Sequence, residues 1–459
     1  MTARAPEPLT RAALSHRLGH PTPVPPVRIV HLGLGAFHRA PQAWYTARAS
    51  DADDWGIAAF TGRHPAAAQL LAAQDGLYTV VERSDAGERT SIGTAIVEAH
   101  DGADLERLVE LLAAPGTAVV TMTVTEAGYH LTPDGLPDRG DPVMAADLEI
   151  LRGAEGVPVS ALGRLVLGLV ARSSAGAGPI AVVPCDNVPS NGAFVGSGVR
   201  ALAATVGPEF AAWVESSVSF VSTSVDRITP ATTADDLRSV AVETGWLDRA
   251  AVVTEPFSDW VLSGSFPAGR PDWESAGARF ADDVEPFERR KLWLLNGAHS
   301  LLASLGALHG HATVAAAIAD GACRAAVLEF WDEAVRHLDA SGLELDAYRA
   351  RLLDRFANGR IQHRLAQIAR DDLVKLRARI VPVARLERAA GRRAHGCARA
   401  VAAWIARAQT ARGGAPVLDR AATTSRVAVL DDALAGDPGF VDTVHSFVRE
   451  YVAMNQEAS

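Results

Sequence analysis

Residues 27–40 read Val27-Arg-Ile-Val-His-Leu-Gly33-Leu-Gly35-Ala-Phe-His38-Arg-Ala40. The first six residues are a β-favouring run, the glycines predict a tight turn, and a helix-permissive stretch follows. In such a βα turn, glycines let the backbone approach a pyrophosphate closely, and the next helix offers free N–H groups. Gly33 and Gly35 take the first two glycine positions of the dinucleotide-binding pattern, whereas His38 takes the third. The pattern is imperfect, so an ordinary tight turn is the alternative interpretation.

Further β-type runs alternate with segments of helical character. The β-type runs span residues 56–61, 118–124, 180–183 and 251–254, and helical segments include residues 103–114 and 161–172. This alternation predicts a largely parallel sheet covered on both faces. From about residue 285, Ala-, Leu- and Arg-rich segments with few β-branched clusters predict helices alone. The sequence thus predicts an α/β protein with an expanded Rossmann-type domain over residues 1–283 and an all-α domain over residues 284–459.

Composition narrows the class of protein. The chain has 459 residues, of which 48% are hydrophobic, and a net charge of −10 without a sustained basic run, which disfavours nucleic acid and anionic membranes as partners. Its three cysteines lack the paired spacing of a disulfide framework or a zinc site, so no metal is predicted. Residues 1–26 lack the apolar core of a signal peptide, and no apolar run approaches membrane-spanning length. We therefore expect a globular cytoplasmic protein.

A second informative stretch is Lys291-Leu-Trp-Leu-Leu-Asn296-Gly-Ala-His299, where three polar side chains interrupt an apolar segment. On an α-helix, Asn296 would lie about 140° and His299 about 80° around the axis from Lys291, so all three project into one sector. Surrounding hydrocarbon would make the ammonium group more acidic and able to exchange protons near neutral pH. The alternative is a surface helix whose lysine extends to water. The stretch follows the change of composition, so we expect it at a cleft where the helical part meets the sheet.

Polar residues also follow several predicted strands, at the edge where ligands dock in such folds. Arg63 stands where a carboxylate usually binds the ribose hydroxyls. It can pair with a 2′-phosphate, which favours NADP, or stack on adenine in an NAD enzyme, so both cofactors stay open. Thr125 with Glu126, and Asn187, follow two later strands, and polar turns are the alternative for both. Asp226 precedes Arg227, and an internal ion pair is the alternative there.

Taken together, the motifs resemble one family, the long-chain, metal-independent polyol dehydrogenases, which include mannitol 2-dehydrogenase and fructuronate reductase. The resemblance covers nearly the whole chain, and the order and spacing of the motifs make it specific. The motifs are Gly33-Leu-Gly35-Ala-Phe37-His38-Arg39-Ala40, Thr125-Glu126-Ala-Gly128-Tyr129, Cys185-Asp186-Asn187 with Pro189 and Asn191-Gly192, Val225-Asp226-Arg227-Ile-Thr-Pro230, Glu255-Pro256-Phe257 with Trp260, and Lys291 with Asn296 and His299.

The resemblance implies hydride transfer with a nicotinamide cofactor and assigns roles to individual residues. Lys291 would be the general acid/base, and Asn187 and Asn296 would hold the reacting oxygen. His299 and Asp226 would bind neighbouring hydroxyls, and Glu288 would relay protons, with a solvated ion pair to Lys291 as the alternative. The residues expected at the cofactor are Gly33, Gly35, Ala36, Phe37, His38, Arg39, Arg63, Thr125, Glu126 and Asn187.

Departures from the family pattern concern the substrate. Gln367 stands where mannitol 2-dehydrogenases can carry an arginine, and a Gly-Ser-Gln segment is replaced by Asp372-Leu-Val, whereas Lys375 is kept. Lys375 would bind a terminal hydroxyl or a uronate carboxylate. The absence of that arginine weakens the case for mannitol in particular. D-Fructose to D-mannitol is the first expectation and D-fructuronate to D-mannonate a close second, with arabinitol oxidation less favoured. A non-catalytic NAD-binding protein is a remote alternative. The resemblance points to a monomer.

Overall fold

The computed structural model describes residues 5–339, 341–361, 363–410 and 419–457. The chain divides into two compact units, and each is considered by itself. Unit 1 comprises residues 1–83 and 87–285, and unit 2 comprises residues 84–86 and 286–459.

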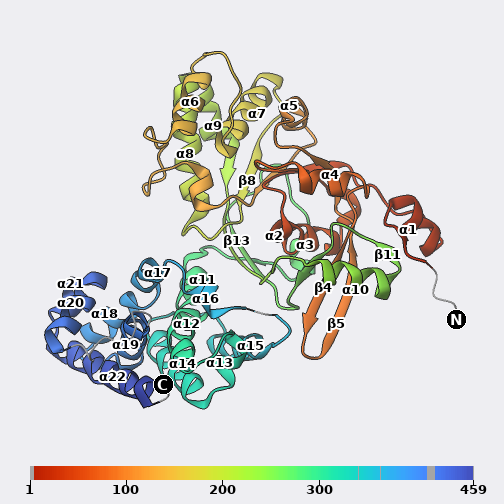
Figure 1. Cartoon of the computed structure of the whole chain (residues 1–459). Helices are drawn as coiled ribbons and strands as arrows, with labels where there is room; N and C mark the ends of the chain where they lie inside the picture. The colour runs from red at the N-terminus through yellow and green to blue at the C-terminus, as the bar shows by residue number, and fades with distance from the viewer. Residues whose placement is uncertain (1–4, 340, 362, 411–418, 458–459) are drawn as a thin grey trace. The chain divides into compact units, whose positions relative to one another are not determined.

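A six-stranded sheet forms the centre of unit 1 (Figure 1). Its strands are β2 (Val27–Leu32), β3 (Gly56–Phe60), β6 (Ile96–His100), β7 (Val119–Met122), β8 (Ile180–Pro184) and β9 (Val218–Phe220). They lie in the order β6-β3-β2-β7-β8-β9, and every neighbouring pair is parallel. The predicted parallel sheet is confirmed. Because β2 pairs with β3 on one side and with β7 on the other, the strand order reverses between β2 and β7, which is where ligands bind in open α/β sheets.

Both faces of this sheet are covered, as expected. Successive side chains point to opposite faces, so Val30 and Val120 join one apolar core while Ile29 and Val119 join another. The first core is closed by helices α5 (Leu105–Ala113), α6 (Pro142–Leu151), α7 (Ala161–Ala175), α8 (Asn191–Val206) and α9 (Pro208–Ser217). The second is closed by α3 (Gln42–Arg48), α4 (Ala66–Ala72) and smaller sheets.

Unit 1 also contains smaller sheets, which the sequence did not predict as separate from the main sheet. One joins β4 (Tyr78–Ser84), β5 (Gly87–Gly93) and β12 (Val252–Thr254), so the strand expected near residue 251 forms but lies outside the main sheet. Another joins β10 (Ser222–Asp226), β13 (Asp259–Ser263) and β14 (Arg279–Phe280). The rest of unit 1 comprises β1 (Glu7–Pro8) paired with β11 (Trp246–Leu247), helices α1 (Arg11–Leu18), α2 (Ala36–Arg39) and α10 (Ala234–Thr244), and 3₁₀ turns at Ala52–Asp54, Glu126–Tyr129 and Trp273–Ala276.

Unit 2 is helical, which confirms the second half of the fold prediction. Its first segments are α11 (Glu285–Arg290), a π-helix (Lys291–Gly297) and α12 (Ala298–Leu308). Then come α13 (Val314–Ala319), α14 (Gly321–Val335), α15 (Leu345–Ala357), α16 (Leu365–Ile368), α17 (Asp372–Arg379), α18 (Val381–Ala389), α19 (His395–Thr410), α20 (Arg420–Leu430), α21 (Asp432–Ala435) and α22 (Pro438–Glu457). α12 is apolar and buried almost all round, and it packs against α13, α14, α16 and α19.

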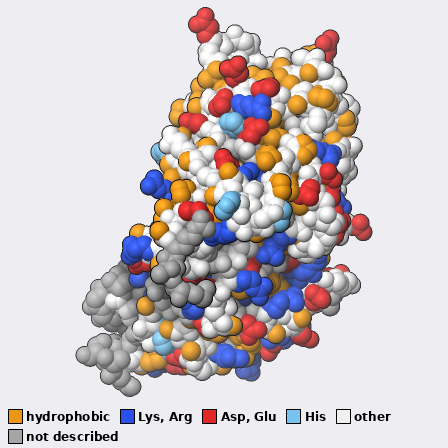
Figure 2. All heavy atoms as spheres, turned by 90° about the vertical axis from the view of Figure 1, so that its right-hand side faces the viewer, with side chains coloured by type: hydrophobic (Ala, Val, Ile, Leu, Met, Phe, Trp, Pro, Cys, Tyr) orange, Lys and Arg blue, Asp and Glu red, His pale blue; other side chains and the backbone are white. Residues whose placement is uncertain are grey.

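The surface carries charges of both signs. On the face drawn in Figure 2, acidic and basic side chains are interspersed among apolar and neutral ones. Among the described residues, no helix combines the length and apolar character needed to cross a membrane. Their three cysteines, Cys185, Cys323 and Cys397, are buried and free.

Candidate functional site

The Gly33 turn lies at the point where the strand order reverses. Gly33 has φ of 109°, and a Cβ atom built there would lie 2.2 Å from the carbonyl oxygen of Thr123, directly after β7. Thr123 Oγ1 in turn donates to the Gly33 carbonyl oxygen at 2.8 Å. Backbone conformation and close approach therefore both require glycine here. A Cβ at Gly35 would meet only the Gly33 oxygen, at 3.7 Å, so Gly35 leaves space above the turn.

A buried histidine, which sequence reasoning missed, supports this turn. His31 of β2 contacts Thr121 Oγ1 through Nδ1 at 2.8 Å and Thr123 Oγ1 through Nε2 at 3.1 Å. Because Thr123 gives its own proton to Gly33, it accepts one from His31 Nε2, and Nδ1 must accept from Thr121. Burial lowers the pKa of His31 to about 3, which keeps the ring neutral and this tautomer in place. The available signal was a histidine inside an otherwise apolar strand.

A cavity of about 490 Å³ opens beside the turn and collects most of the residues predicted at the cofactor. Its lining includes Gly33, Gly35, Ala36, Phe37, Thr125, Glu126 and Asn187, together with Cys185 and Asp186. The lining thus joins the turn after β2 to the segments after β7 and β8. Those are the segments whose polar residues suggested ligand contact from the sequence.

His38 and Arg39, also predicted at the cofactor, lie outside that lining. The buried His38 ring stacks on His31 with centroids 3.3 Å apart, and the buried Arg39 guanidinium donates from Nε to the Gly35 oxygen at 3.1 Å and from Nη1 to the Ala250 oxygen. On α2, Ala36 and Phe37 line the cavity, whereas His38 and Arg39 are buried in the interior. The structure therefore places both side chains among internal contacts, and their expected contact with the cofactor stays a prediction.

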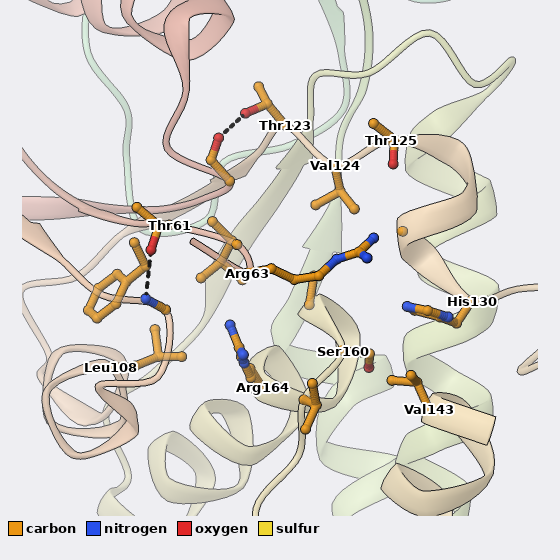
Figure 3. A pocket seen from close by; sticks show the side chains of 18 residues that line it. Thr61, Arg63, Leu108, Thr123, Val124, Thr125, His130, Val143, Ser160 and Arg164 are labelled. Atoms are coloured by element: carbon orange, nitrogen blue, oxygen red, sulfur yellow. Dashed lines mark hydrogen bonds between the residues drawn. The ribbon is translucent and has the colours of Figure 1, made fainter. Parts of the chain in front are cut away.

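A second cavity, of about 270 Å³, begins at Gly33 and extends past the end of β3 (Figure 3). Arg63 projects into it, and so does Arg164 from α7. Arg164 Nε has no hydrogen-bond partner within the described part of the chain, and burial lowers the pKa of this guanidinium. Two arginines line this cavity and no carboxylate does. Arg164 was not identified from the sequence, because it lies about a hundred residues from Arg63 on an ordinary helix.

The turn after β8 holds Asn187 at the first cavity. Asp186 accepts hydrogen bonds from the Tyr129 hydroxyl and, at 2.9 Å, from the Val188 N–H. Burial raises the pKa of Asp186. These hydrogen bonds hold the residues on either side of Asn187. Asn187 itself is exposed and lines the cavity. Asp226 is buried at the end of β10 in the same unit.

In unit 2, Lys291 and Asn296 lie in a π-helix rather than the expected α-helix. The hydrogen bonds of a π-helix run from residue i to i+5. Residues five apart therefore lie closer to one another around the helix axis than they do in an α-helix. The expected separation of about 140° between Lys291 and Asn296 is therefore wrong, and the two side chains are brought nearer to one face. Both are half-buried, as is Glu288 one segment earlier, and His299 is buried in α12.

His299 lies against aromatic and cationic groups of unit 2. Its ring centroid is 4.9 Å from that of Phe356 and 4.8 Å from that of His363. Burial lowers the pKa of His299 well below its ordinary value, and His363, Arg355 and Arg379 lower it further. The ring is therefore neutral at physiological pH, and Nε2 has no hydrogen-bond partner in the described residues. A neutral imidazole with an available nitrogen is suited to a substrate hydroxyl.

Two cations of α17 have different tasks. Arg379, which sequence reasoning missed, donates from Nη1 to the Asn296 carbonyl oxygen at 3.2 Å and to Ser300 Oγ at 3.1 Å. It thereby ties α17 to the π-helix. Lys375, predicted to bind substrate, instead donates to backbone oxygens at the end of α16, those of Ile368 at 3.0 Å and Arg370. Burial lowers the pKa of both, that of Arg379 to about 10.

Comparison with known proteins gives matches to both parts of the chain. Residues 27–275 match the family described as the mannitol dehydrogenase Rossmann domain, and residues 283–432 match the mannitol dehydrogenase C-terminal domain. D-Mannonate oxidoreductase of Escherichia coli (strain K12) is 39% identical over 388 residues, covering 82% of this chain and 79% of that protein. Mannitol 2-dehydrogenase of Cereibacter sphaeroides is 38% identical over 298 residues, covering 63% and 61%. The structure of Pseudomonas fluorescens mannitol 2-dehydrogenase in ternary complex with NAD and D-mannitol superposes with a TM-score of 0.78 at 30% identity, covering 95% of this chain and 94% of that one.

Proposed function

The chain belongs to the mannitol dehydrogenase family, and from this premise we propose that it is an NAD-dependent oxidoreductase that interconverts a polyol and its 2-keto sugar. D-Mannitol and D-fructose are the principal substrate pair. The observation that carries the proposal is the cavity of about 490 Å³ at the Gly33 turn, because it joins three strand ends whose residues the family resemblance assigns to the cofactor.

The shape of the turn fits a dinucleotide. Gly33 holds two loops in contact, and Gly35 leaves open the space that a Cβ would partly fill, so a pyrophosphate can approach the backbone. Gly33, Gly35, Ala36, Phe37, Thr125, Glu126 and Asn187 would hold the cofactor, with Arg63 at its adenosine end. When bound, nicotinamide accepts hydride from the alcohol or supplies it to the ketone.

Proton transfer is assigned to residues of the chain. Lys291 takes the proton from the reacting hydroxyl in oxidation and returns it to the carbonyl oxygen in reduction. The side-chain amide of Asn296 donates to that oxygen, and the resemblance gives the same task to Asn187. Such a fixed donor is typically worth about 2.7–4 kcal/mol of barrier. Glu288 relays the proton from Lys291 to solvent.

Substrate hydroxyls next to the reacting carbon are assigned to two further residues. His299 offers a neutral ring whose buried Nε2 can exchange a hydrogen bond with one of them. Asp226 accepts from another. Residues 1–283 would then bind the dinucleotide, and residues 284–459 would supply the acid/base group and most of the substrate contacts.

A second candidate substrate is D-fructuronate, which would be reduced to D-mannonate. It is favoured by the positive charge of Arg355 and Arg379 near His299, because these groups attract a carboxylate. The 39% identity with D-mannonate oxidoreductase agrees with it. Lys375 is less suited to that contact than expected, since its ammonium group already binds backbone oxygens.

The deciding experiment is a matrix of steady-state assays of D-fructose and D-fructuronate, each with NADH and with NADPH. We expect kcat/KM to be higher with NADH and to identify one of the two ketoses as the main substrate. An Arg164→Ala variant tests whether the second cavity binds the adenosine end, since it should raise the KM of the nucleotide and leave that of the sugar. Nucleotide binding without turnover of any polyol or uronate would reject the enzymatic proposal.

The proposal also covers the cellular compartment and the oligomeric state of the enzyme. Three buried thiols without a disulfide among the described residues suit a reducing compartment, so we assign the protein to the cytoplasm. We also expect a monomer, on the family resemblance. Sedimentation of the purified protein measures the oligomeric state directly.

A further inference from the structure

Four metal-binding side chains gather where α12 ends and α14 begins. His309 follows the last residue of α12, and His311 lies two residues further along. Asp320 is the N-cap of α14, and the buried Cys323 lies in the first turn of that helix. None of these four residues belongs to the hydride-transfer machinery proposed above.

Both histidines of the cluster contact the same carboxylate oxygen. His309 Nδ1 lies 2.9 Å and His311 Nε2 lies 3.0 Å from the same carboxylate oxygen, Asp320 Oδ2. Ligand atoms of His309, Asp320 and Cys323 all lie within 4.8 Å of one another. In a tetrahedral zinc site with bonds of about 2.0–2.3 Å, neighbouring ligand atoms are roughly 3.3–3.8 Å apart. Small side-chain movements would therefore bring His309, Asp320 and Cys323 to coordination distances. His311 lies outside this group of three and joins it through its contact with Asp320 Oδ2, so it would supply the fourth ligand after a larger rotation.

The second oxygen of the aspartate is already held by the protein. Asp320 Oδ1 accepts from the Ala322 N–H at 2.8 Å and from the Cys323 N–H at 3.2 Å. These bonds orient the carboxylate and leave Oδ2 directed at the histidines. Outer hydrogen bonds of this kind support the ligands of metal sites.

We propose that His309, His311, Asp320 and Cys323 bind one divalent transition-metal ion, with Zn²⁺ the best match, as a clamp between α12 and α14. Two imidazole nitrogens, one carboxylate oxygen and one thiolate are the donors that Zn²⁺ prefers. The carboxylate and the thiolate together neutralise the charge of the ion. On binding, Cys323 releases its thiol proton to solvent, and each imidazole coordinates as the neutral tautomer whose proton is on the ring nitrogen facing away from Asp320, Nε2 in His309 and Nδ1 in His311.

The sequence did not predict this site, because no pair of cysteines marks it. The two histidines are separated from the other ligands by all of α13. The site has no part in hydride transfer, so its role is structural. It would fix the end of the helix that begins at Ala298 and carries His299.

The test is a metal titration of the full-length protein after chelator treatment and desalting. Co²⁺ should bind at one equivalent, with a thiolate charge-transfer band in the near ultraviolet and tetrahedral d–d bands in the visible, and Zn²⁺ should displace it. Zn²⁺ should also raise the Tm of the wild-type protein. Cys323→Ser and His309→Gln each remove a ligand, so each should weaken binding by more than the about 10–100-fold that is typical of losing an outer-shell partner. Cys323→Ser should abolish the charge-transfer band, and His309→Gln should shift it.

Cys397→Ser is the matched control, since Cys397 is also buried in unit 2 but lies outside the cluster. It should bind Co²⁺ as the wild type does. The proposal is overturned if no saturable binding occurs, or if binding survives both Cys323→Ser and His309→Gln. Circular dichroism shows whether each variant is folded, and His311→Gln serves as a further ligand variant if Cys323→Ser is not. Because the readouts are metal stoichiometry and absorption spectra, the result is independent of the proposed dehydrogenase activity.

Discussion

At the scale of single residues, the choice between lysine and arginine carries information. The chain has 44 basic residues, and only Lys291 and Lys375 are lysines. Arginine stays protonated at any physiological pH, whereas lysine can lose its proton when its surroundings favour the neutral form. One of the two lysines of this arginine-rich chain stands at the position where the proposed mechanism needs proton exchange.

This contrast gives a direct test of Lys291. Lys291→Arg keeps the charge but removes the exchangeable proton, so we expect kcat to fall about 10²–10⁴-fold while the Kd for NADH stays within twofold. Stopped-flow and fluorescence titration measure the two quantities. Lys375→Arg is the matched control and should keep most of the turnover, because an arginine can still donate to the oxygens of Ile368 and Arg370. Equal turnover in Lys291→Arg and Lys375→Arg would contradict the assignment of Lys291 as the general acid/base.

Gly33 is the second residue with a sharp expectation. In Gly33→Ala, the new methyl group meets the Thr123 oxygen and the backbone is held at positive φ, so we expect a loss of about 1–3 kcal/mol in stability and at least a tenfold weaker affinity for NADH. Gly176→Ala is the control, because Gly176 has φ of 62° but nothing within 4 Å of its added Cβ. Thermal unfolding and NADH titration separate the two effects. Unchanged NADH affinity in a folded Gly33→Ala protein would contradict the proposed site.

At the scale of elements, the π-helix depends on its neighbour. The wider turn leaves backbone carbonyls that α-helical bonds do not satisfy, and the Asn296 oxygen is met by Ser300 Oγ and by Arg379 of α17. The position of the Asn296 amide therefore depends on a residue more than eighty positions away. Arg379 is in this sense a positioning residue.

Removing this support should affect catalysis more than cofactor binding. In Arg379→Gln we expect a loss of about 1.5–3 kcal/mol in stability and a fall in kcat, with the Kd for NADH unchanged. Arg379→Lys should restore part of the activity, since an ammonium group can still reach one of the two acceptors. Arg377→Gln is the control on the same helix, because Arg377 donates to the Val429 oxygen and not to the π-helix. A purely structural role would lower the Tm and leave kcat unaltered.

At the scale of the whole molecule, unit 2 is held together by ion pairs as well as by its apolar core. The Glu387 carboxylate of α18 is buried and accepts from Arg336 and His337 at the end of α14 and from Arg392. Burial opposes ionisation, but the hydrogen bonds from Arg336, Arg392 and His337 outweigh it and lower the pKa of Glu387 to about 2. Because this pKa is lowered, the ionised Glu387 carboxylate contributes its full stabilisation above the ordinary glutamate pKa of 4.5. The stabilisation is lost as pH falls towards 2.

Because the pKa of Glu387 is lowered in the folded protein, unit 2 should lose stability in acid. Glu387→Gln should lower the free energy of unfolding at pH 7 by about 1–3 kcal/mol, because its three partners lose a charged acceptor. The difference from wild type should shrink between pH 4.5 and pH 2. Urea unfolding at a series of pH values measures it. Glu450→Gln, at an exposed glutamate, should show no such trend, and a constant difference for Glu387→Gln would contradict the assignment.

The sequence alone was enough to predict the parallel sheet, the helical second half and the glycine turn. Each of these rests on interactions between residues close in the chain: β-branched runs, helical periodicity and the backbone freedom of Gly33. The identities of Lys291, Asn296 and His299 were also visible, because three polar groups in an apolar segment contradict the local pattern.

Only the tertiary structure decided where those side chains lie and what surrounds them. The engagement of Lys375 with the oxygens of Ile368 and Arg370 depends on how α17 follows α16. The support of the π-helix by Arg379 and the burial of His38 and Arg39 depend on contacts with distant segments. The meeting of Arg164 and Arg63 in one cavity also joins segments far apart in the chain. The same is true of the four ligands proposed at the start of α14. Burial and hydrogen-bond partners are set by packing between elements, and local propensity and spacing contain no record of which distant groups will meet.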